Sequence, residues 1–212
     1  MIKQGTDEWH NARLAKVTAS RLSAVMAKTK SGYSATRKNY MMELICQKLS
    51  GQREESYTNT AMQRGNDLEP IARGAYEADK GVFVDEVGLI LHPAEIDFAA
   101  SPDGLVGNDG LVEIKCPNTA THVEFLQSGK IDNRYILQMY AQMLCTGRRW
   151  CDFVSFDDRL PEKLSFKCVR LDLDEGKASE ILVEIKSFLS DLDDLERSLR
   201  EMMNEAEYKG SE

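Results

Sequence analysis

Two acidic residues and a lysine lie close together in the segment 101–116, SPDGLVGNDGLVEIKC. Asp103 and Glu113 are ten residues apart, and Lys115 follows Glu113 by two. Glycines and a polar turn separate the two acids, while Leu, Val and Ile flank them. This pattern predicts a β-hairpin that carries charged side chains on a largely apolar frame.

The register of this hairpin decides which charged groups meet. Because side chains alternate along a strand, Glu113 and Lys115 share one face. A two-residue turn would point Asp103 away from them. A loop with an odd number of residues, such as 107–109 or 106–110, would pair Asp103 directly with Glu113. We predict the odd loop, which places all three charged side chains on one patch.

Paired carboxylates repel one another unless a cation lies between them. Because neither His nor Cys shares the predicted patch, the oxygen ligands favour Mg²⁺ or Mn²⁺ over zinc. Mg²⁺ accepts phosphate oxygens and retains waters, one of which the Lys115 ammonium could orient. The set suits hydrolysis of a phosphodiester. The alternative is a plain ion pair on a surface hairpin, but the apolar neighbours indicate a half-buried sheet, where unpaired charge is costly.

The surrounding sequence predicts helices before and after a group of strands. Expected helices cover 17–28, 35–51, 61–81, 134–147 and 175–208, and expected strands cover 82–92, 98–106, 110–116, 150–158 and 164–174. The last helix carries a narrow apolar seam that packs on the domain or on another subunit, and the seam allows two or three subunits. We expect a single domain over 1–212, of the α/β class, with a central mixed β-sheet flanked by helices and a long C-terminal helix.

Composition limits the class of protein. The chain is 42% apolar and 29% charged, as is ordinary for a globular protein. Its five cysteines are odd in number and form no CxxC pair, which predicts reduced thiols in a cytoplasm. No apolar run approaches the roughly 20 residues that span a bilayer, and the N-terminus lacks the apolar core of a signal peptide. We therefore expect a cytoplasmic protein with no membrane partner.

Charge is distributed unevenly along the chain. The net charge is −8, yet residues 1–50 hold nine Lys/Arg against three Asp/Glu, and residues 174–212 hold twelve Asp/Glu against five Lys/Arg. Because phosphate contacts depend on local Lys and Arg, the basic N-terminal part could bind a polyanion. The acidic C-terminal part is expected to form an outer, solvated face.

Several segments resemble the lambda-phage exonuclease family, the YqaJ-type viral recombinases. Asp103 after a proline, followed by Glu113-Ile114-Lys115, matches the signature of the PD-(D/E)xK nuclease superfamily. That short signature is accompanied, in the family's order, by WHNARLAKVTAS (9–20), RGNDLEPIARGAYE (64–77), SPDGL (101–105), EIKCP (113–117) and YILQMYAQM (135–143). The resemblance covers roughly residues 8–160 and implies a restriction-endonuclease-like nuclease core.

The resemblance also implies an activity. Members of such a family degrade one strand of linear double-stranded DNA from 5′ to 3′ into mononucleotides, and the remaining 3′ overhang enters phage recombination by strand annealing. It implies two Mg²⁺ ions, with Mn²⁺ as a substitute, and a ring-shaped homotrimer around DNA. It further implies a single-strand annealing protein as partner, in the cytoplasm of a bacterial host.

Site residues follow from the matched motifs. By resemblance, Asp103 and Glu113 are metal ligands together with the carbonyl of Ile114, and Lys115 positions the attacking water. Glu69 matches a third acid that reaches the metal site.

Other matched positions concern the cleft and the DNA. Tyr135 and Gln138 match a helix that lines the cleft, with Gln142 as a weaker candidate. Arg13 and Ser20 match residues that hold the 5′-phosphate. Met62 falls where the family has an apolar wedge that parts the base pair.

Each of these assignments has a simpler alternative. Glu69 could merely favour the helix dipole, and Ser20 could be a helix cap. Arg13 could pair with Asp7 or Glu8. Tyr135 and Met62 could be packing residues.

Two other functions share the same motifs. A restriction- or repair-type endonuclease would use the same acidic hairpin but would cut closed circular DNA. A catalytically silent DNA clamp would show no metal-dependent turnover. Linear and circular substrates, with and without metal, separate the three.

Overall fold

The computed structural model describes residues 2–53 and 60–209. The helices are α1 (Asp7–Ala12), α2 (Leu22–Val25), α3 (Ala35–Ser50), α4 (Thr60–Lys80), α5 (Thr119–Ser128), α6 (Asn133–Thr146) and α7 (Glu175–Lys209), with 3₁₀ turns η1 (Ala19–Arg21) and η2 (Glu162–Leu164). The strands are β1 (Val17–Thr18), β2 (Lys28–Thr29), β3 (Gly32–Tyr33), β4 (Val84–Asp85), β5 (Ile90–Leu91), β6 (Phe98–Ala100), β7 (Gly104–Val106), β8 (Gly110–Lys115), β9 (Trp150–Phe156) and β10 (Phe166–Asp172).

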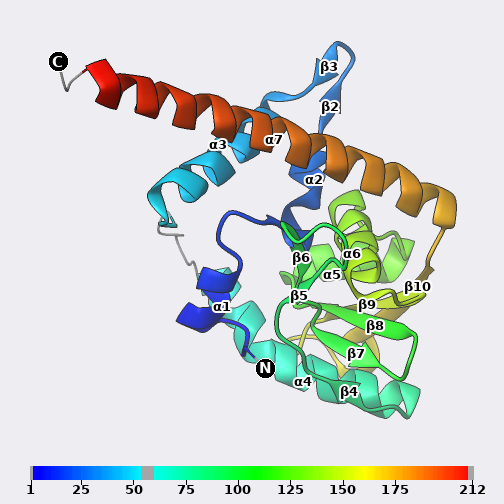
Figure 1. Cartoon of the computed structure of the whole chain (residues 1–212). Helices are drawn as coiled ribbons and strands as arrows, with labels where there is room; N and C mark the ends of the chain where they lie inside the picture. Colours follow the sequence, from blue (N-terminus) through cyan, green and yellow to red (C-terminus); the bar gives the residue numbers. More distant parts are fainter. Residues whose placement is uncertain (1, 54–59, 210–212) are drawn as a thin grey trace.

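A five-stranded mixed sheet forms the centre of the molecule. Its order is β10-β9-β8-β7-β4, with β8 and β9 parallel and the other neighbours antiparallel. A smaller sheet, β1-β6-β5, lies beside it, and α6 contacts strands of both sheets. Helix α4 packs on β8, β9 and β10, and Figure 1 shows α4 and α7 on opposite sides of the strands. The predicted α/β fold, with a mixed sheet flanked by helices and a long C-terminal helix, is confirmed.

The β7–β8 hairpin has the odd loop that its glycines predict. Leu105 pairs with Leu111, and Val106 pairs with Gly110, which leaves the three residues 107–109 in the loop. Gly107 has φ +53°, a backbone conformation that glycine adopts without steric cost. The same register brings the residue before β7 opposite Glu113.

The apolar seam of α7 packs on its own chain. Ile181, Ile185, Phe188 and Leu192 are fully buried in the main core, and Leu195 and Leu199 pack against it. Figure 1 shows α7 running alongside α3 and extending past it toward the C-terminus. The sequence allowed the seam to pack on the domain or on another subunit, and in the structure it packs on the domain.

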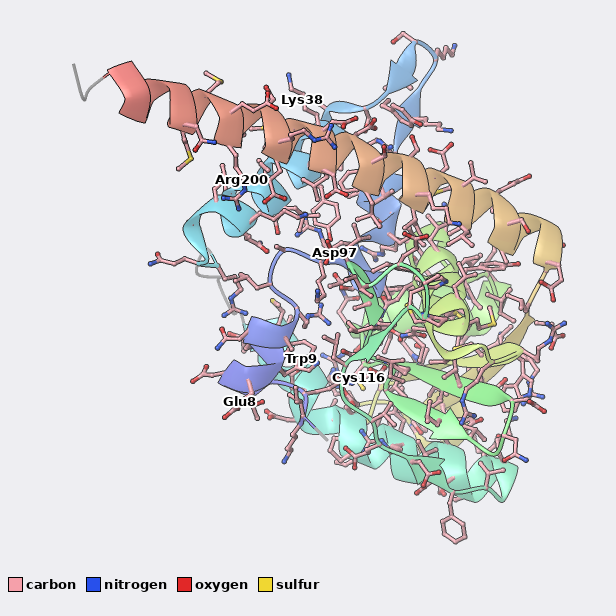
Figure 2. All side chains as sticks on the ribbon, in the orientation of Figure 1. Glu8, Trp9, Lys38, Asp97, Cys116 and Arg200 are labelled. Carbon is pink, nitrogen blue, oxygen red and sulfur yellow. The ribbon has the colours of Figure 1, made fainter. Side chains whose placement is uncertain are left out.

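Ion pairs join the basic N-terminal part to the acidic helix α7. Lys28 Nζ lies 2.5 Å from Glu184 Oε1, and Lys48 Nζ lies 3.0 Å from carboxylate oxygens of both Asp193 and Glu196. Lys48 also reaches Asp97, which is labelled in Figure 2. The charge separation along the sequence is therefore partly neutralised within the fold, which leaves fewer of these cations available to a polyanion.

Several predicted elements are wrong in their bounds. The predicted helix 17–28 is broken, because Val17–Thr18 instead forms a parallel strand against Phe98–Ala99. The predicted strand 82–92 forms only the short strands β4 and β5, and 98–106 divides into β6 and β7 in different sheets. Helices α1 and α5 had no prediction, because each is short and weakly amphipathic.

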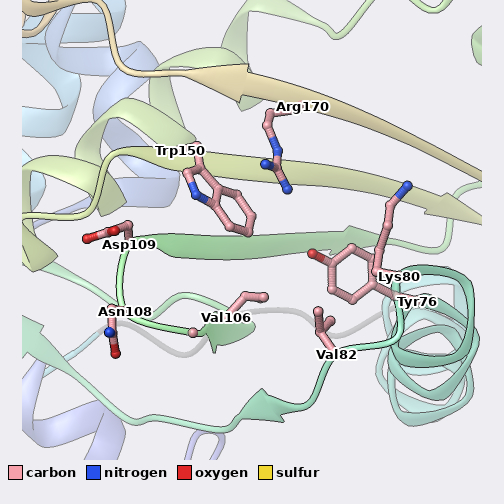
Figure 3. Close-up of a pocket in the computed structure, with 9 residues that line it drawn as sticks. Tyr76, Lys80, Val82, Val106, Asn108, Asp109, Trp150 and Arg170 are labelled. Atoms are coloured by element: carbon pink, nitrogen blue, oxygen red, sulfur yellow. The ribbon is translucent and has the colours of Figure 1, made fainter.

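A cavity of about 360 Å³ lies at the Gly110 end of β8, opposite the end that carries Lys115 (Figure 3). Beside it, Arg170 stacks 3.5 Å above the ring of Trp150. Arg170 donates from Nε and Nη2 to the buried Asp152, which also accepts the Tyr76 hydroxyl at 2.8 Å. Asp152 pairs here with Arg170 and with the Tyr76 hydroxyl. We therefore interpret this end of β8 as a part that stabilises the fold.

Gly110 leaves no room for a side chain at this position. A Cβ built there would lie 2.0 Å from Cζ2 of the Trp150 ring, which Arg170 covers. We expect Gly110→Ala to lower the free energy of unfolding by about 1–3 kcal/mol, because the indole must move. Chemical denaturation measures the change.

Gly74 supplies the matched control, because it is an exposed residue of α4 with nothing within 4 Å of a built Cβ. Gly74→Ala should raise the free energy of unfolding by about 0.5–1 kcal/mol. Equal stability of Gly110→Ala and the wild type would show that the close approach is not a constraint.

Candidate active site

The catalytic candidates gather where β7 begins and β8 ends. Asp103 lies directly before β7, and its Oδ2 accepts a hydrogen bond of 2.7 Å from the backbone N–H of Ile114. This bond crosses between the two strands and fixes the carboxylate beside β8. The structure therefore brings Asp103, Glu113 and Lys115 together, as the odd loop predicts.

Glu113 is completely buried, and side chains from α6 hold its carboxylate. Gln138 Nε2 donates to Oε1 at 2.7 Å, and Gln142 Nε2 donates to Oε2 at 2.5 Å. Lys115 forms an ion pair with the same Oε1. The two glutamines lie one helical turn apart, so one face of α6 fixes both oxygens.

Lys115 lies between the carboxylates and the ring of Tyr135. Its ammonium is 5.3 Å from the Tyr135 ring centroid, and its side chain is 28% exposed. Burial alone would lower the Lys115 pKa, but the nearby Glu113 and Asp103 carboxylates outweigh burial, so the pKa rises above its ordinary value. Lys115 is therefore a cation that can hold or orient a water but does not readily give up its proton.

The surroundings of Asp103 disfavour its ionised form. Burial, followed by repulsion from Glu113, raises the pKa of Asp103 well above its ordinary range, and Glu69 raises it further. Glu69 on α4 is held by Arg73, whose Nη2 lies 2.8 Å from Glu69 Oε1. Three acids thus lie near one end of β8, opposed by Lys115 at Glu113 and by Arg73 at Glu69.

This setting fits a hard divalent cation. Within residues 2–53 and 60–209, no group of three or more His, Cys, Asp and Glu side chains is gathered closely enough to hold a metal ion. The buried carboxylate of Glu113, the half-buried carboxylate of Asp103 and the Ile114 carbonyl are nevertheless the oxygen donors that Mg²⁺ takes alongside water. A cation there would relieve the repulsion that raises the Asp103 pKa.

Arg13 belongs to a second group of residues, which includes Ser101, two positions before Asp103. Its guanidinium stacks 4.1 Å over the ring of Trp9, and its Nη1 lies 3.4 Å from the Ser101 hydroxyl. Trp9 Nε1 donates to the same hydroxyl at 2.9 Å. Figure 2 labels Trp9 on α1 and also Cys116, the residue after Lys115. Among the described residues, Arg13 forms no ion pair with Asp7 or Glu8, which disfavours that alternative.

Ser20 and Met62, the other two residues predicted to contact the DNA end, are both exposed. Ser20 is exposed in η1, with no hydrogen bond to Arg13 among the described residues. However, β1 and β6 are parallel, and Ser20 and Ser101 each follow the paired residues Thr18 and Ala99 by two positions. The two serines therefore leave the small sheet at the same edge. Met62 is 52% exposed near the start of α4.

Comparison with known proteins identifies the family. Residues 8–149 match the model of the YqaJ-like viral recombinase domain. This chain belongs to the YqaJ-like viral recombinase family. The resemblance inferred from the motifs is thereby confirmed over most of the chain.

Solved structures agree with this family assignment. The alkaline exonuclease LHK-Exo from Laribacter hongkongensis is 51% identical, with a TM-score of 0.89, and the match covers 95% of this chain and 100% of that chain. A structure of LHK-Exo in complex with dAMP matches at 52% identity over the same shares, also with a TM-score of 0.89. These matches support a nuclease.

Two more distant relatives extend the comparison. A phage-related exonuclease from Haemophilus somnus 129PT is 16% identical with a TM-score of 0.68, covering 89% of this chain and 96% of that chain, and shows a shared fold. The uncharacterized protein R354 of Acanthamoeba polyphaga mimivirus is 28% identical over 72% of this chain, which spans 29% of that protein's length. None of the described helices of this chain is both long and apolar enough to cross a membrane.

Sequence reasoning missed or undervalued two residues of the site. Ser101 had no predicted role, yet it joins Trp9 to Arg13. Gln142 was only a weak candidate, yet its buried amide binds Glu113 as closely as Gln138 does. The four-residue spacing of the two glutamines was the available signal, because it places both on one helix face.

Proposed function

We propose that this YqaJ-like recombinase is a Mg²⁺-dependent 5′→3′ exonuclease that degrades one strand of linear double-stranded DNA to mononucleotides. The observation that carries the proposal is the buried Glu113 carboxylate, held by two glutamines beside Asp103 and Lys115. Such an arrangement holds one carboxylate in a fixed orientation, as a catalytic or metal-binding group requires. A plain ion pair on the protein surface would not need this support. The similarity to an alkaline exonuclease over its whole length supports the same chemistry.

Asp103, Glu113 and the Ile114 carbonyl would hold the metal, as one or two Mg²⁺ ions with Mn²⁺ as a substitute. When bound, the ion neutralises charge on the phosphate and lowers the pKa of bound water. Gln138 and Gln142 keep the Glu113 carboxylate in one orientation through both of its oxygens. Their role is to preserve ligand geometry before DNA arrives.

Lys115 would orient the attacking water and stabilise negative charge that builds on the phosphate. Its ion pair with Glu113 holds the ammonium beside the reaction, where it contributes electrostatic stabilisation. Tyr135 limits the positions that the ammonium can reach, since its ring lies 5.3 Å away. Glu69 adds negative charge near Asp103 and is the third acid available to the metal site.

Polarity would come from recognition of the 5′-phosphate by Arg13. Trp9 and Ser101 hold the guanidinium, and Ser20 lies at the same edge of the small sheet. Burial lowers the pKa of Arg13, but an arginine remains charged at any physiological pH. Met62, exposed near the start of α4, is the candidate wedge that parts the terminal base pair.

We extend the proposal to assembly and biology on the basis of the family. The expected assembly is a ring-shaped homotrimer that encircles DNA. The expected role is to leave a 3′ single-stranded overhang for a single-strand annealing protein during phage-type recombination in a bacterial host. Mass measurement under native conditions tests the trimer.

The activity is tested with three substrates: linear duplex with a 5′-phosphate, the same duplex with a 5′-hydroxyl, and covalently closed circular DNA. Each is incubated with Mg²⁺ or with chelator, and label at the 5′ or 3′ end reports the direction. We expect Mg²⁺-dependent release of the 5′ label as mononucleotide from linear DNA. Cutting of the closed circle would indicate an endonuclease, and absence of turnover would indicate a DNA clamp.

Arg13→Ala should remove most of the preference for 5′-phosphorylated over 5′-hydroxyl ends. A charge-assisted hydrogen bond contributes about 1.5–3 kcal/mol, which corresponds to roughly 10–100-fold in the ratio of rates. Arg21→Ala is the matched control, because Arg21 is exposed and pairs with Glu43. If Arg13→Ala kept the wild-type ratio of rates on 5′-phosphorylated and 5′-hydroxyl ends, Arg13 would have no part in recognition of the DNA end.

A further inference from the structure

A cavity of about 470 Å³ opens beside Lys115 and is separate from the Arg13 group. Phe153 and Ser155 of β9 line it, together with residues of α5 and the start of α6. In the central sheet, β9 and β7 lie on opposite sides of β8. Since Ser101 and Asp103 lead into β7, the catalytic end of β8 lies between the Arg13 group and this cavity.

The walls combine aromatic rings with a cationic rim. Phe125 and Phe153 are buried, with ring centroids 5.2 Å apart, and Tyr135 lies 5.4 Å from Phe153. At the rim, Lys130 is exposed, and the Arg134 guanidinium lies 4.7 Å over the Tyr135 ring. An apolar cavity that offers the partly exposed Tyr135 ring and is bordered by cations suits a nucleobase that remains joined to phosphate.

Two acids also line the cavity and narrow the choice of ligand. Asp132 caps α6 and pairs with Arg134 at 3.3 Å, and Glu124 is exposed on α5. Because both carboxylates are exposed, they oppose a free anion at the rim, and one of them already pairs with Arg134. The arrangement favours a neutral base inside, with its phosphate near Lys115 and Lys130.

We infer that this cavity receives the base of the second nucleotide, on the 3′ side of the bond that is cut. The inference rests on the proposed function. In that reaction, water oxygen bonds to phosphorus as the bond to the 3′ oxygen of the terminal nucleotide breaks. That oxygen takes a proton and leaves as the 3′-hydroxyl of the mononucleotide, and the second nucleotide keeps the new 5′-phosphate.

The place of the second nucleotide follows from where its strand can continue. The terminal nucleotide extends from the cut toward Arg13, and the second nucleotide stays attached to phosphorus through its 5′ oxygen, to the side of the line of attack. The cavity beside Lys115, on the side of β8 away from the Arg13 group, is an opening into which its base can extend. Holding the second base there would keep the strand in line for the next cut.

Thr121→Trp tests the inference, because Thr121 is an exposed residue of α5 that lines the cavity, and an indole there would fill it. Gln127→Trp is the matched control, because Gln127 is exposed on the same helix and does not line the cavity. The two substrates are 5′-phosphorylated duplexes with a normal or an abasic second nucleotide. Dissociation constants are measured in Ca²⁺ by fluorescence anisotropy, and single-turnover rates in Mg²⁺.

Because the second base would lose its stacking surface, Thr121→Trp should bind the normal duplex roughly tenfold more weakly than the wild type. Both proteins should bind the abasic duplex equally, and Gln127→Trp should match the wild type on both. Equal weakening on both duplexes, or none on either, would overturn the inference. If the wild type hydrolyses neither duplex but this binding pattern holds, the proposed hydrolysis fails while the base-binding cavity stands.

Discussion

Lys115→Ala is expected to lower the rate of DNA hydrolysis by roughly 10²–10⁴-fold, with little change in affinity for DNA. Lys115 is the cation paired with the buried Glu113 carboxylate, and we propose that it orients the attacking water. Its removal takes away charge that is needed most in the transition state. Single-turnover kinetics separates this loss in the chemical step from any change in binding.

The same substitution must be distinguished from a loss of folding. Glu113 would still accept hydrogen bonds from Gln138 and Gln142, so we expect the fold to persist. Lys80→Ala is the matched control, because Lys80 lies beside the cavity at the other end of β8. A Lys115→Ala protein that is folded and hydrolyses DNA as fast as wild type would exclude Lys115 from the chemistry.

Asp103→Asn is expected to abolish turnover and, in chelator, to stabilise the protein. Loss of this proposed metal ligand should remove several kcal/mol of transition-state stabilisation, or roughly 10³-fold or more in rate. The stability gain follows because burial and then Glu113 raise the pKa of Asp103 in the folded state. An ionised Asp103 therefore costs folding energy, and the amide removes that cost.

The direction of the stability change follows from how the free energy of unfolding depends on pH. A carboxyl whose folded pKa is raised binds its proton more tightly when folded, so stability falls as pH rises from the unfolded pKa through the folded one. In chelator, Asp103→Asn should exceed the wild type in unfolding free energy at pH 8, with a smaller difference at pH 4. Mg²⁺ should narrow this gap, because the ion binds the folded wild type.

Glu113→Gln should behave differently, although it also removes an acid from the site. The new side chain carries an NH₂ group, which would face the NH₂ group of Gln138 or Gln142. Two buried hydrogen-bond donors would then point at each other with no acceptor between them. We expect a loss of about 1–3 kcal/mol in unfolding free energy. If both amide substitutions changed stability in the same direction, the electrostatic account of the two carboxylates would be wrong.

Much of the fold could be predicted from local sequence patterns. The predicted helix 35–51 is observed as α3, which ends before Gly51 in the left-handed conformation. The predicted helix 134–147 is observed as α6, with Gly147 playing the same part. Glycine after an apolar periodic segment is a strong and local signal, so these ends needed no tertiary information.

Other elements depend on partners that lie far away in the chain. Val17–Thr18 has a helical neighbourhood in sequence but becomes a strand through pairing with β6, roughly eighty residues later. The hairpin register was predictable because it depends on loop length and on Gly107 alone. The same local reasoning brought Asp103, Glu113 and Lys115 together.

The surroundings of the site were harder to predict than its centre. Ser101 meets Arg13 only because β1 and β6 run parallel side by side, which local patterns do not reveal. The basic N-terminal part was expected to be able to bind a polyanion, but ion pairs with α7 occupy some of its cations. Pairing across the fold is decided by packing and not by composition.

The central claim is that Asp103 and Glu113 share a divalent cation at the end of β8. Anomalous diffraction from crystals soaked in Mn²⁺ tests it directly. We predict a peak within coordination distance of both carboxylates and of the Ile114 carbonyl, and no peak in Asp103→Asn crystals. A wild-type peak elsewhere, or none with Lys115 still paired to Glu113, would contradict the account.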